Sequence, residues 1–207
     1  MAGAVKKKRE RYSYADYLSW GDDQRCELID GDICAMTSPS VVHQSILTQL
    51  IKQFAVFFDE KPCKVFCAPL DLVLDKKSKK NDEIFTVVQP DIMVVCDEKK
   101  IEEQRIVGAP DLIIEIISPS TAARDNISKK ALYEKAGVRE FWLVSPTDRL
   151  IRVYRLEKDG LFGRDDVYDE TAQIDIALFA GLTIDCRRVF PKLPEIKRVK
   201  EPPMQYL

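Results

Sequence analysis

The chain has 207 residues, of which 45% are hydrophobic, and a formal net charge of -2. This length predicts one domain with a substantial core, and the near-neutral charge excludes a generally basic protein that coats nucleic acid. We expect a mobile basic tail at residues 1–11, a single domain at residues 12–190, and a Pro-rich charged tail at residues 191–207. No apolar run approaches the roughly 20 residues of a membrane span, and the amino terminus lacks a signal-peptide core, so we expect a cytoplasmic protein without membrane contact.

The six cysteines give no sign of a zinc site or of stabilising disulfides. None forms a CxxC pair. Cys63 and Cys67 lie in a segment of strand character, where a rise of roughly 3.3 Å per residue holds them apart. His43 is the single histidine of the chain, which excludes a histidine-rich metal site. We therefore expect reduced cysteines in a cytoplasmic setting.

The amino-terminal part predicts two helices separated by a β-hairpin. A capping box that starts at Ser13 begins a short helix, which we expect to continue through Trp20. Residues 25–29 and 33–36 flank an Asp-Gly turn and predict a hairpin. Apolar residues then recur at helical spacing over residues 40–58, which predicts one long amphipathic helix.

The rest of the chain predicts a sheet with one further helix. The expected strands are apolar or alternating runs bounded by prolines, glycines or charged loops, and they cover residues 64–74, 87–96, 105–109, 112–118, 140–145, 150–156, 166–169 and 182–185. The helix is expected at residues 121–136, with Asp125 near its start and Gly137 as its stop. We predict an α/β (α+β) fold with a mixed sheet, flanking helices and added hairpins.

Two carboxylates interrupt strands that otherwise look fully buried. Glu115 lies at the centre of the apolar run from Leu112 to Ser118, and Asp91 follows Pro90 in another such run. An ionised carboxylate in these surroundings costs several kcal/mol unless a cation, a metal or several donors compensate it. We expect the two strands to be neighbours in one sheet packed against the long helix. The pair therefore predicts a metal site, and hard oxygen ligands favour magnesium or manganese.

Three further side chains are candidates for the same site. His43 faces inward near the start of the long helix, where it is either a satisfied core or cap residue or part of a site. Lys129 lies along the buried stripe of the second long helix, whereas Lys130 is better placed for solvent. Glu27, taken alone, reads as a polar residue on the exposed face of an edge hairpin.

Other kinds of site have less support. The eight glycines form no phosphate-binding loop and there is no GxSxG elbow, so neither nucleoside-triphosphate chemistry nor a serine hydrolase is expected. The basic segments at residues 6–9 and 76–80 either contact nucleic acid or are merely solvated, as short lysine runs in tails and loops usually are.

The order of these motifs resembles a known family. Gln89-Pro90-Asp91 comes first, then Glu115 followed by Ile-Ile-Ser-Pro-Ser-Thr, and then Lys129 with Tyr133 before a Gly-Val-Arg-Glu-Phe-Trp run. The likeness also includes Glu27-Leu28-Ile29-Asp30-Gly31, Ser38-Pro39 with His43, Asp71 and Asp125. Over residues 12–190 the chain resembles the Uma-type restriction endonuclease family of the PD-(D/E)XK nuclease superfamily. The resemblance implies a restriction-endonuclease-like core with a magnesium site.

The resemblance also implies roles for individual residues. Asp91 and Glu115 would be metal ligands, and the backbone carbonyl of Ile116 would be a third. The chain departs from the E-x-K pattern because Ile117 stands where lysine is expected. The resemblance implies that Lys129 takes this place from the following helix, where it would orient the nucleophile or offset charge on the reacting phosphate.

The implied activity is hydrolysis of phosphodiester bonds, with DNA as the expected substrate, Mg or Mn as cofactor and a homodimer as the working assembly. Glu27 and His43 match family positions near the cleft, where either would accept a proton or hold a water. Two alternatives stay open. The missing E-x-K lysine is compatible with an inactive nuclease-fold protein that binds nucleic acid or a protein partner. Asp91 and Glu115 could also be structural, each paired with a buried Lys or Arg.

Overall fold

A computed structural model describes residues 11–20, 25–74, 80–118 and 128–190. Both expected tails fall almost wholly outside these ranges, as do the basic segments at residues 6–9 and 76–79, so the expected domain limits stay a prediction. The expected stop at Gly21 and the helix start at Asp125 also lie outside the described residues. Within the described part, no helix combines the length and the apolar character needed to cross a membrane.

The helices are short except for one. They are α1 (Tyr14–Ser19), α2 (Val41–Phe58), α4 (Lys130–Ala136) and α5 (Cys186–Val189), with 3-10 turns η1 (Asn81–Glu83) and η2 (Glu98–Lys100). The strands are β1 (Cys26–Ile29), β2 (Asp32–Ala35), β3 (Lys64–Cys67), β4 (Asp71–Val73), β5 (Val87–Val88), β6 (Ile92–Val95), β7 (Arg105–Val107), β8 (Leu112–Ile116), β9 (Glu140–Ser145), β10 (Leu150–Arg155), β11 (Asp166–Asp169), β12 (Gln173–Asp175) and β13 (Thr183–Asp185).

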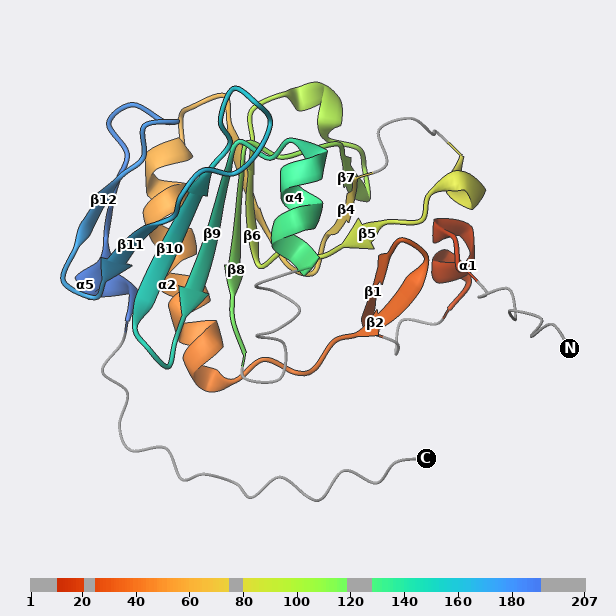
Figure 1. The fold of residues 1–207 in the computed structure, drawn as a ribbon, viewed down its shortest axis with the longest axis horizontal. Helices are drawn as coiled ribbons and strands as arrows, with labels where there is room; N and C mark the ends of the chain where they lie inside the picture. Colours follow the sequence, from red (N-terminus) through yellow and green to blue (C-terminus); the bar gives the residue numbers. More distant parts are fainter. Residues whose placement is uncertain (1–10, 21–24, 75–79, 119–127, 191–207) are drawn as a thin grey trace, which may run out of the picture.

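These strands form two large mixed sheets and a small one. A six-stranded sheet has the order β11-β10-β9-β8-β6-β3, a five-stranded sheet has the order β2-β1-β5-β4-β7, and β12 pairs with β13. The β8–β9 and β4–β7 pairs are parallel and the other pairs are antiparallel. In Figure 1 the six-stranded sheet lies between α2 and α4, and the five-stranded sheet carries α1 at the far end of the molecule.

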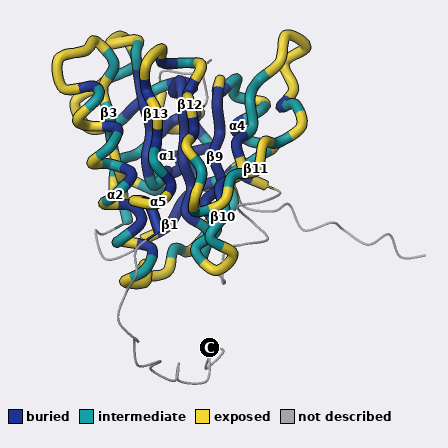
Figure 2. The backbone as a smooth tube through the Cα atoms, turned by 90° about the vertical axis from the view of Figure 1, so that its left-hand side faces the viewer, coloured by how far each residue is buried: buried dark blue, intermediate teal, exposed yellow. Residues whose placement is uncertain are grey.

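Alternation along β8 explains the layers. Leu112, Ile114 and Ile116 are buried in the core that α2 covers, and Ile113 is buried in the core that contains Tyr133 of α4. Because side chains alternate between faces of a strand, Glu115 lies on the α4 side with Ile113. Figure 2 shows the buried residues running along the strands and the exposed ones along the loops around them.

The predicted helix starts and hairpin turn are confirmed. Ser13 and Asp16 form the capping box of α1, and Ser40 caps α2 by accepting a hydrogen bond from the His43 amide. The turn between β1 and β2 has positive φ at both Asp30 (52°) and Gly31 (83°), as a type I′ turn requires. At Gly31 a Cβ would also lie 2.9 Å from Cβ of Arg11, so glycine is needed for space as well.

Two of the predicted strands, each of which contains a proline, are divided between the two sheets. Residues 64–74 become β3 in the six-stranded sheet and β4 in the five-stranded sheet, and residues 87–96 become β5 and β6 in the same two sheets. Pro69 and Pro90 lie at the two breaks, since proline has no N–H to continue a ladder. The sequence analysis also missed β12 and α5, which are too short for a periodic signal.

The expectation that no disulfide forms is wrong. Cys63 and Cys96 form a disulfide across β3 and β6. Lys64 pairs with Val95 in this antiparallel ladder, so the residues just beyond them, Cys63 and Cys96, come to face one another. Cys26, Cys34, Cys67 and Cys186 are free thiols, and burial raises the pKa of Cys186 to about 11.

Candidate active site

The site forms where the chain passes twice between the large sheets. The first passage, from β3 to β4, contains the cis peptide bond between Ala68 and Pro69. The second passage, from β5 to β6, contains Gln89 and Asp91. The amide of Ala68 donates to the backbone oxygen of Asp91 at 3.3 Å, so the two passages lie side by side. A polar side chain placed there can therefore meet groups from both sheets.

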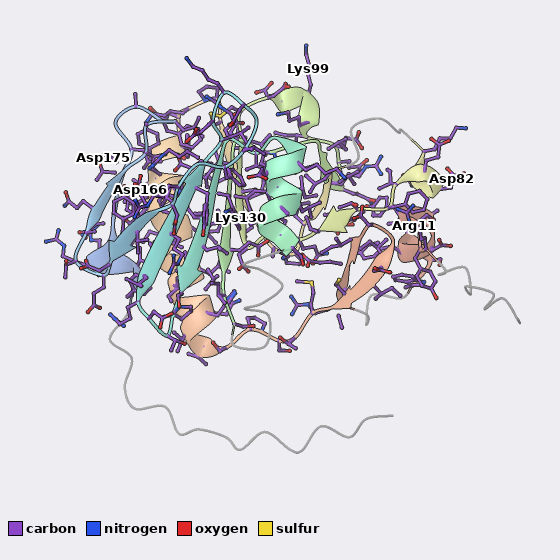
Figure 3. The ribbon with its side chains drawn as sticks, in the orientation of Figure 1. Arg11, Asp82, Lys99, Lys130, Asp166 and Asp175 are labelled. Carbon is purple, nitrogen blue, oxygen red and sulfur yellow. A yellow bond between two sulfur atoms is a disulfide. The ribbon has the colours of Figure 1, made fainter. Side chains whose placement is uncertain are left out.

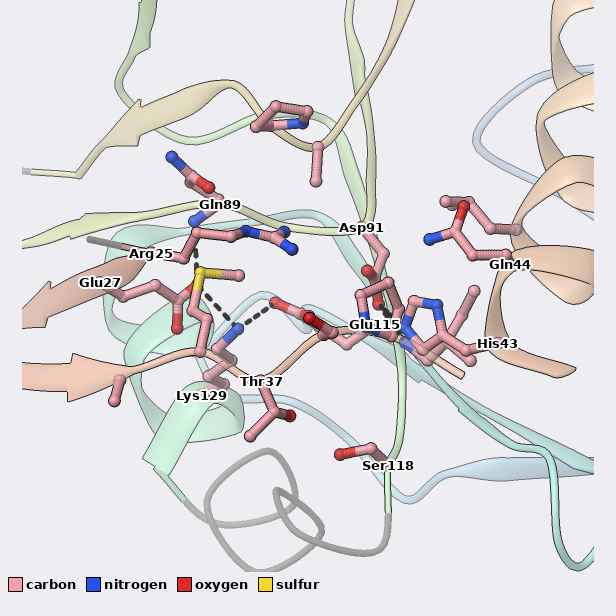
Figure 4. A pocket seen from close by; sticks show the side chains of 18 residues that line it. Arg25, Glu27, Thr37, His43, Gln44, Gln89, Asp91, Glu115, Ser118 and Lys129 are labelled. Carbon is pink, nitrogen blue, oxygen red and sulfur yellow. Dashed lines mark hydrogen bonds and ion pairs between the residues drawn. The ribbon is translucent and has the colours of Figure 1, made fainter. Parts of the chain in front are cut away.

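A cavity of ≈ 300 Å³ opens at these passages. Its wall is built from β1, the passages, the start of α2, the end of β8 and the turn before α4 (Figure 4). All of the predicted site residues line it, namely Glu27, His43, Asp91, Glu115, Ile116 and Lys129. The structure thus brings these residues together in one cavity, and their assignment to an active site stays a prediction.

Lys129 links carboxylates from the two sheets. Its Nζ donates to Oε1 of Glu115 at 2.9 Å and to Oε1 of Glu27 at 3.0 Å. Tyr133, one helical turn further on, donates its hydroxyl to the same Glu115 oxygen at 2.6 Å. Lys129 lies at the N-cap of α4 with helical backbone angles, directly before the first residue of that helix. The predicted inward placement of Lys129 is confirmed.

Among the residues that the structure describes, this cluster contains two carboxylates, Glu27 and Glu115, and the ammonium of Lys129. Glu27, Glu115 and Lys129 are 2%, 4% and 5% exposed, so water screens none of them well. Neutral donors supply part of the compensation, because the amide of Gln89 also donates to Oε1 of Glu27 at 2.9 Å and Tyr133 donates to Glu115. A single ammonium shared by two buried carboxylates would leave both poorly compensated if it were lost.

Glu27 corrects one expectation. Taken alone, it reads as a residue on the exposed face of an edge hairpin, but its side chain is buried in the cavity wall. The reason is that β1 is not an edge strand: it pairs with β2 on one side and with β5 on the other. The edge position belongs to β2.

Asp91 is held by groups from β8 and α2. Its Oδ2 accepts a hydrogen bond from the amide of Ile116 at 2.7 Å and lies 3.2 Å from Nε2 of His43. His43 is buried as predicted, and its Nδ1 is the one buried side-chain polar atom without a hydrogen-bond partner among the described residues. Lys130, which we expected to face solvent, is half-buried (Figure 3). Its Nζ lies over the ring of Tyr154, 4.4 Å from the ring centroid.

Behind the cavity, Asp71 is the centre of a second polar network that the sequence analysis did not identify. Its carboxylate accepts hydrogen bonds from the hydroxyls of Tyr14 at 2.9 Å and Tyr17 at 3.2 Å, and from Nε2 of Gln89 at 2.9 Å. Burial and the neighbouring Asp71 charge raise the pKa of Tyr14 and of Tyr17. The side chain of Gln89 belongs to this network, and its backbone amide donates to Glu27 in the cavity wall. Gln89 therefore connects the tyrosines of α1 with the cavity.

The donors in the cavity can be compared with those that a metal ion requires. Within the part of the chain that the structure describes, no group of three or more His, Cys, Asp or Glu side chains is arranged to hold a metal. Asp91, Glu115 and Ile116 line the same cavity, and both described contacts of the Asp91 carboxylate are made by Oδ2. Two carboxylates and a backbone carbonyl are hard oxygen donors, which fit a divalent cation that keeps several waters.

Comparisons with known proteins identify the family of the chain. A family model described as Uma2, putative restriction endonuclease, matches residues 14–187. The uncharacterized protein slr1290 of Synechocystis is 31% identical over 153 residues, covering 72% of this chain and 77% of the relative. The uncharacterized protein sll1609 of the same organism is 22% identical over 168 residues, covering 79% and 91%.

A solved structure supports the fold. The crystal structure of a putative nuclease belonging to DUF820 from Anabaena variabilis superposes with a TM-score of 0.69 at 20% identity, covering 86% of this chain and 97% of that one. The predicted mixed α and β fold is thereby confirmed. The family match extends over most of the described residues and includes every residue of the cavity wall. The chain therefore belongs to the Uma2 family of putative restriction endonucleases.

Proposed function

We propose that this protein is a magnesium- or manganese-dependent endonuclease that hydrolyses phosphodiester bonds of DNA. The observation that carries the proposal is the meeting of Asp91 and Glu115, from neighbouring strands, in one cavity with the ammonium of Lys129. This arrangement supports the roles that the family resemblance implies. It also supplies a lysine to the second carboxylate although Ile117 occupies the usual place of that lysine.

In this proposal Asp91, Glu115 and the carbonyl of Ile116 hold the cation, which when bound polarises the phosphate and activates water. The Ile116 amide fixes one Asp91 oxygen at 2.7 Å and so sets the orientation of that carboxylate. Lys129 keeps its ammonium beside Glu115 at 2.9 Å, from where it orients the attacking water or offsets charge on the reacting phosphate. Tyr133, one helical turn after Lys129, donates to the same Glu115 oxygen at 2.6 Å and restrains that carboxylate.

Glu27 and His43 have supporting roles in the proposal. Glu27 holds the Lys129 ammonium at 3.0 Å, so its loss would let the lysine turn away from the reacting groups. His43 lies beside Asp91, with Nε2 3.2 Å from Oδ2, and is placed to hold a water or accept a proton. Unchanged metal-dependent cleavage in both Glu27→Gln and His43→Ala would remove these two roles.

The primary test is nicking of supercoiled plasmid with magnesium or manganese by the wild-type protein and Asp91→Asn. We expect metal-dependent nicking that falls by at least about a hundredfold in the variant, because Asp91 is a proposed ligand of the cation on which the reaction depends. Asp82→Asn is the matched control, because Asp82 is an exposed carboxylate on η1. Equal nicking by wild type and Asp91→Asn would place the chemistry elsewhere.

Calorimetric titration with magnesium or manganese separates the nuclease from a structural use of the carboxylates. The ion pair between Lys129 and Glu115 by itself fits a structural use, whereas the neighbour of Asp91 is a histidine and not the expected Lys or Arg. We expect wild type to bind the ion and Asp91→Asn to bind it at least about tenfold more weakly. Binding without cleavage would instead favour an inactive nuclease-fold protein that binds nucleic acid or a protein partner.

The proposal also takes the protein to act in the cytoplasm as a homodimer, so that both strands of DNA are cut. Sedimentation of the wild-type protein with and without duplex DNA measures the assembly directly. A monomer that cuts only one strand per binding event would remove the dimer from the proposal and leave the hydrolysis itself unaffected.

A further inference from the structure

A second and larger cavity lies away from the carboxylates. It is an open groove of ≈ 810 Å³ between the second half of α2, the turn before β13 and the start of α5. α2 contacts both β13 and α5, and Figure 2 shows these elements on one side of the molecule. We call it the α2–α5 groove. The side chains that define its chemistry are Lys52, Gln53, Phe57, Lys61, Thr183 and Arg188.

The charge of the α2–α5 groove is opposite to that of the chain. Lys52, Lys61 and Arg188 line it, and among the described residues no carboxylate side chain does, although the whole chain has a formal net charge of -2. The nearby Asp185 is already bound by Arg187, with contacts of 2.9 Å and 3.0 Å to its two oxygens. The groove therefore presents a concave, positively charged surface with amide and hydroxyl groups beside it, which suits an anion with several oxygens.

The aromatic residue of the groove narrows the choice of ligand. Proteins that bind unpaired bases use open aromatic faces as stacking platforms. Here the ammonium of Lys61 lies 2.9 Å from the centroid of the Phe57 ring and covers that face. The α2–α5 groove thus offers charge and hydrogen bonds more than stacking, which favours phosphate groups over bases.

A continuous exposed row on α2 joins the two cavities. Gln44 lines the carboxylate cavity, Lys52 lines the α2–α5 groove, and Thr48 lies exposed midway at the i, i+4 spacing that aligns side chains along a helix. At a rise of about 1.5 Å per residue, Gln44 and Lys52 are roughly 12 Å apart along the axis. One strand of a duplex advances about 3.4 Å per phosphate, so this distance corresponds to three or four phosphates.

We propose that the α2–α5 groove binds backbone phosphates of the nucleic acid whose cleavage site lies in the carboxylate cavity, three or more nucleotides away along the same strand. This inference rests on the proposed nuclease function and adds to it a positioning site of stated chemistry. Lys52, Lys61 and Arg188 are the phosphate-binding residues, and none of them contacts the reacting groups.

The test measures how binding depends on salt. Fluorescence anisotropy of a labelled 20-base-pair duplex is recorded with Asp91→Asn, which blocks cleavage, and with the same protein carrying Lys52→Gln, Lys61→Gln and Arg188→Gln. Each lost phosphate contact should reduce the slope of log affinity against log salt by about 0.9, so the triple substitution should reduce it by about 2 to 3. Lys99→Gln, Lys158→Gln and Arg164→Gln remove the same charge from exposed positions elsewhere and should leave the slope nearly unchanged.

Cleavage kinetics separate this inference from the proposed function. In the active background the triple variant should need about tenfold more DNA for half-maximal rate, with the maximal rate within about twofold of wild type.

Three outcomes would contradict the proposed phosphate site. Equal slopes for the groove variant and its control, with cleavage intact, would overturn phosphate binding in the groove and keep the nuclease. Absence of duplex binding by Asp91→Asn in low salt would overturn the groove and the DNA substrate together. Equal weakening of binding to inorganic polyphosphate would show a general polyanion site and overturn the assignment to DNA.

Discussion

Two polar networks meet at Gln89, and they hold buried carboxylates in different ways. In the first, Glu27 and Glu115 share one ammonium, that of Lys129, across two sheets. In the second, Asp71 is surrounded by neutral donors, which are the hydroxyls of Tyr14 and Tyr17 and the side-chain amide of Gln89. A charged partner compensates strongly but leaves a large deficit when it is removed, whereas several neutral donors each contribute modestly. The first network is therefore the fragile one.

The largest effect is expected from Lys129→Ala. This change leaves two buried carboxylates without their shared cation, so the free energy of unfolding should fall by about 3–5 kcal/mol. Metal-dependent cleavage should fall at the same time by at least about a hundredfold. Urea denaturation and plasmid nicking measure the two effects. Lys135→Ala on the exposed face of α4 is the control, and equal stability of the two variants would contradict the shared-cation account.

A smaller loss is expected when one neutral donor is removed from Asp71. Tyr14→Phe deletes a hydrogen bond to a charged group and should lower the free energy of unfolding by about 1.5–3 kcal/mol. Tyr12→Phe is a matched control, because the Tyr12 ring packs edge-to-face on Trp20 at 5.4 Å and its hydroxyl makes no hydrogen bond to a described residue. Urea denaturation of both variants measures this loss. If Tyr14→Phe lowered the free energy of unfolding as much as Lys129→Ala, the two networks would not differ in the way described.

Glu27→Gln should change stability by less than about 1 kcal/mol, because it removes one of two acids that share a single cation and keeps an oxygen for the Gln89 amide. Cleavage should nevertheless fall, since Lys129 loses one of the two carboxylates that fix its ammonium. Glu98→Gln, an exposed carboxylate on η2, is the control. A stability loss as large as that of Lys129→Ala would show that Glu27, and not the lysine, dominates the cluster.

The smallest effect concerns a buried acid outside both networks. Burial raises the pKa of Glu140, although hydrogen bonds from Trp142 and the charge of Arg155 act in the opposite direction. A raised pKa means that the folded state binds the proton more tightly, so this contribution to stability is present at low pH and is lost as pH rises above the ordinary value of 4.5. Glu140→Gln should therefore gain stability relative to wild type between acid and neutral pH. Denaturation across this range, with Glu103→Gln as control, checks the sign.

The sequence predicts the burial of Glu115 and Lys129 better than it predicts the division of the strands between two sheets. Glu115 interrupts a continuous apolar run, and Lys129 and Tyr133 are one helical turn apart, so the local pattern was enough to predict that Glu115 and Lys129 are buried. The division of residues 64–74 and 87–96 between two sheets depends on which ladder each half joins, and a proline signals only that the ladder is interrupted. The burial of Glu27 could not be predicted for the same reason, since it follows from the pairing of β1 with β5.

Contacts between segments far apart in the sequence could not be predicted from local patterns either. The Asp71 network joins α1 to β4 through residues 57 and 54 positions apart, and the disulfide joins cysteines 33 positions apart. No periodicity within a short window records such pairs. The part that family likeness supplied was the role of each residue, because spacing alone gives proximity but not chemistry.

The double passage of the chain between the sheets makes the cavity a property of the whole domain. Lys129 and Glu27 are 102 positions apart in sequence, and they meet only when the two sheets have docked. Closing so long a loop has an entropic cost that local structure cannot offset, so the cavity cannot be present in a partly folded intermediate that lacks either sheet. A ligand that needs the intact cavity thus binds only the native state. At concentrations above its dissociation constant, such a ligand should stabilise the entire domain and raise its unfolding temperature with the logarithm of the ligand concentration.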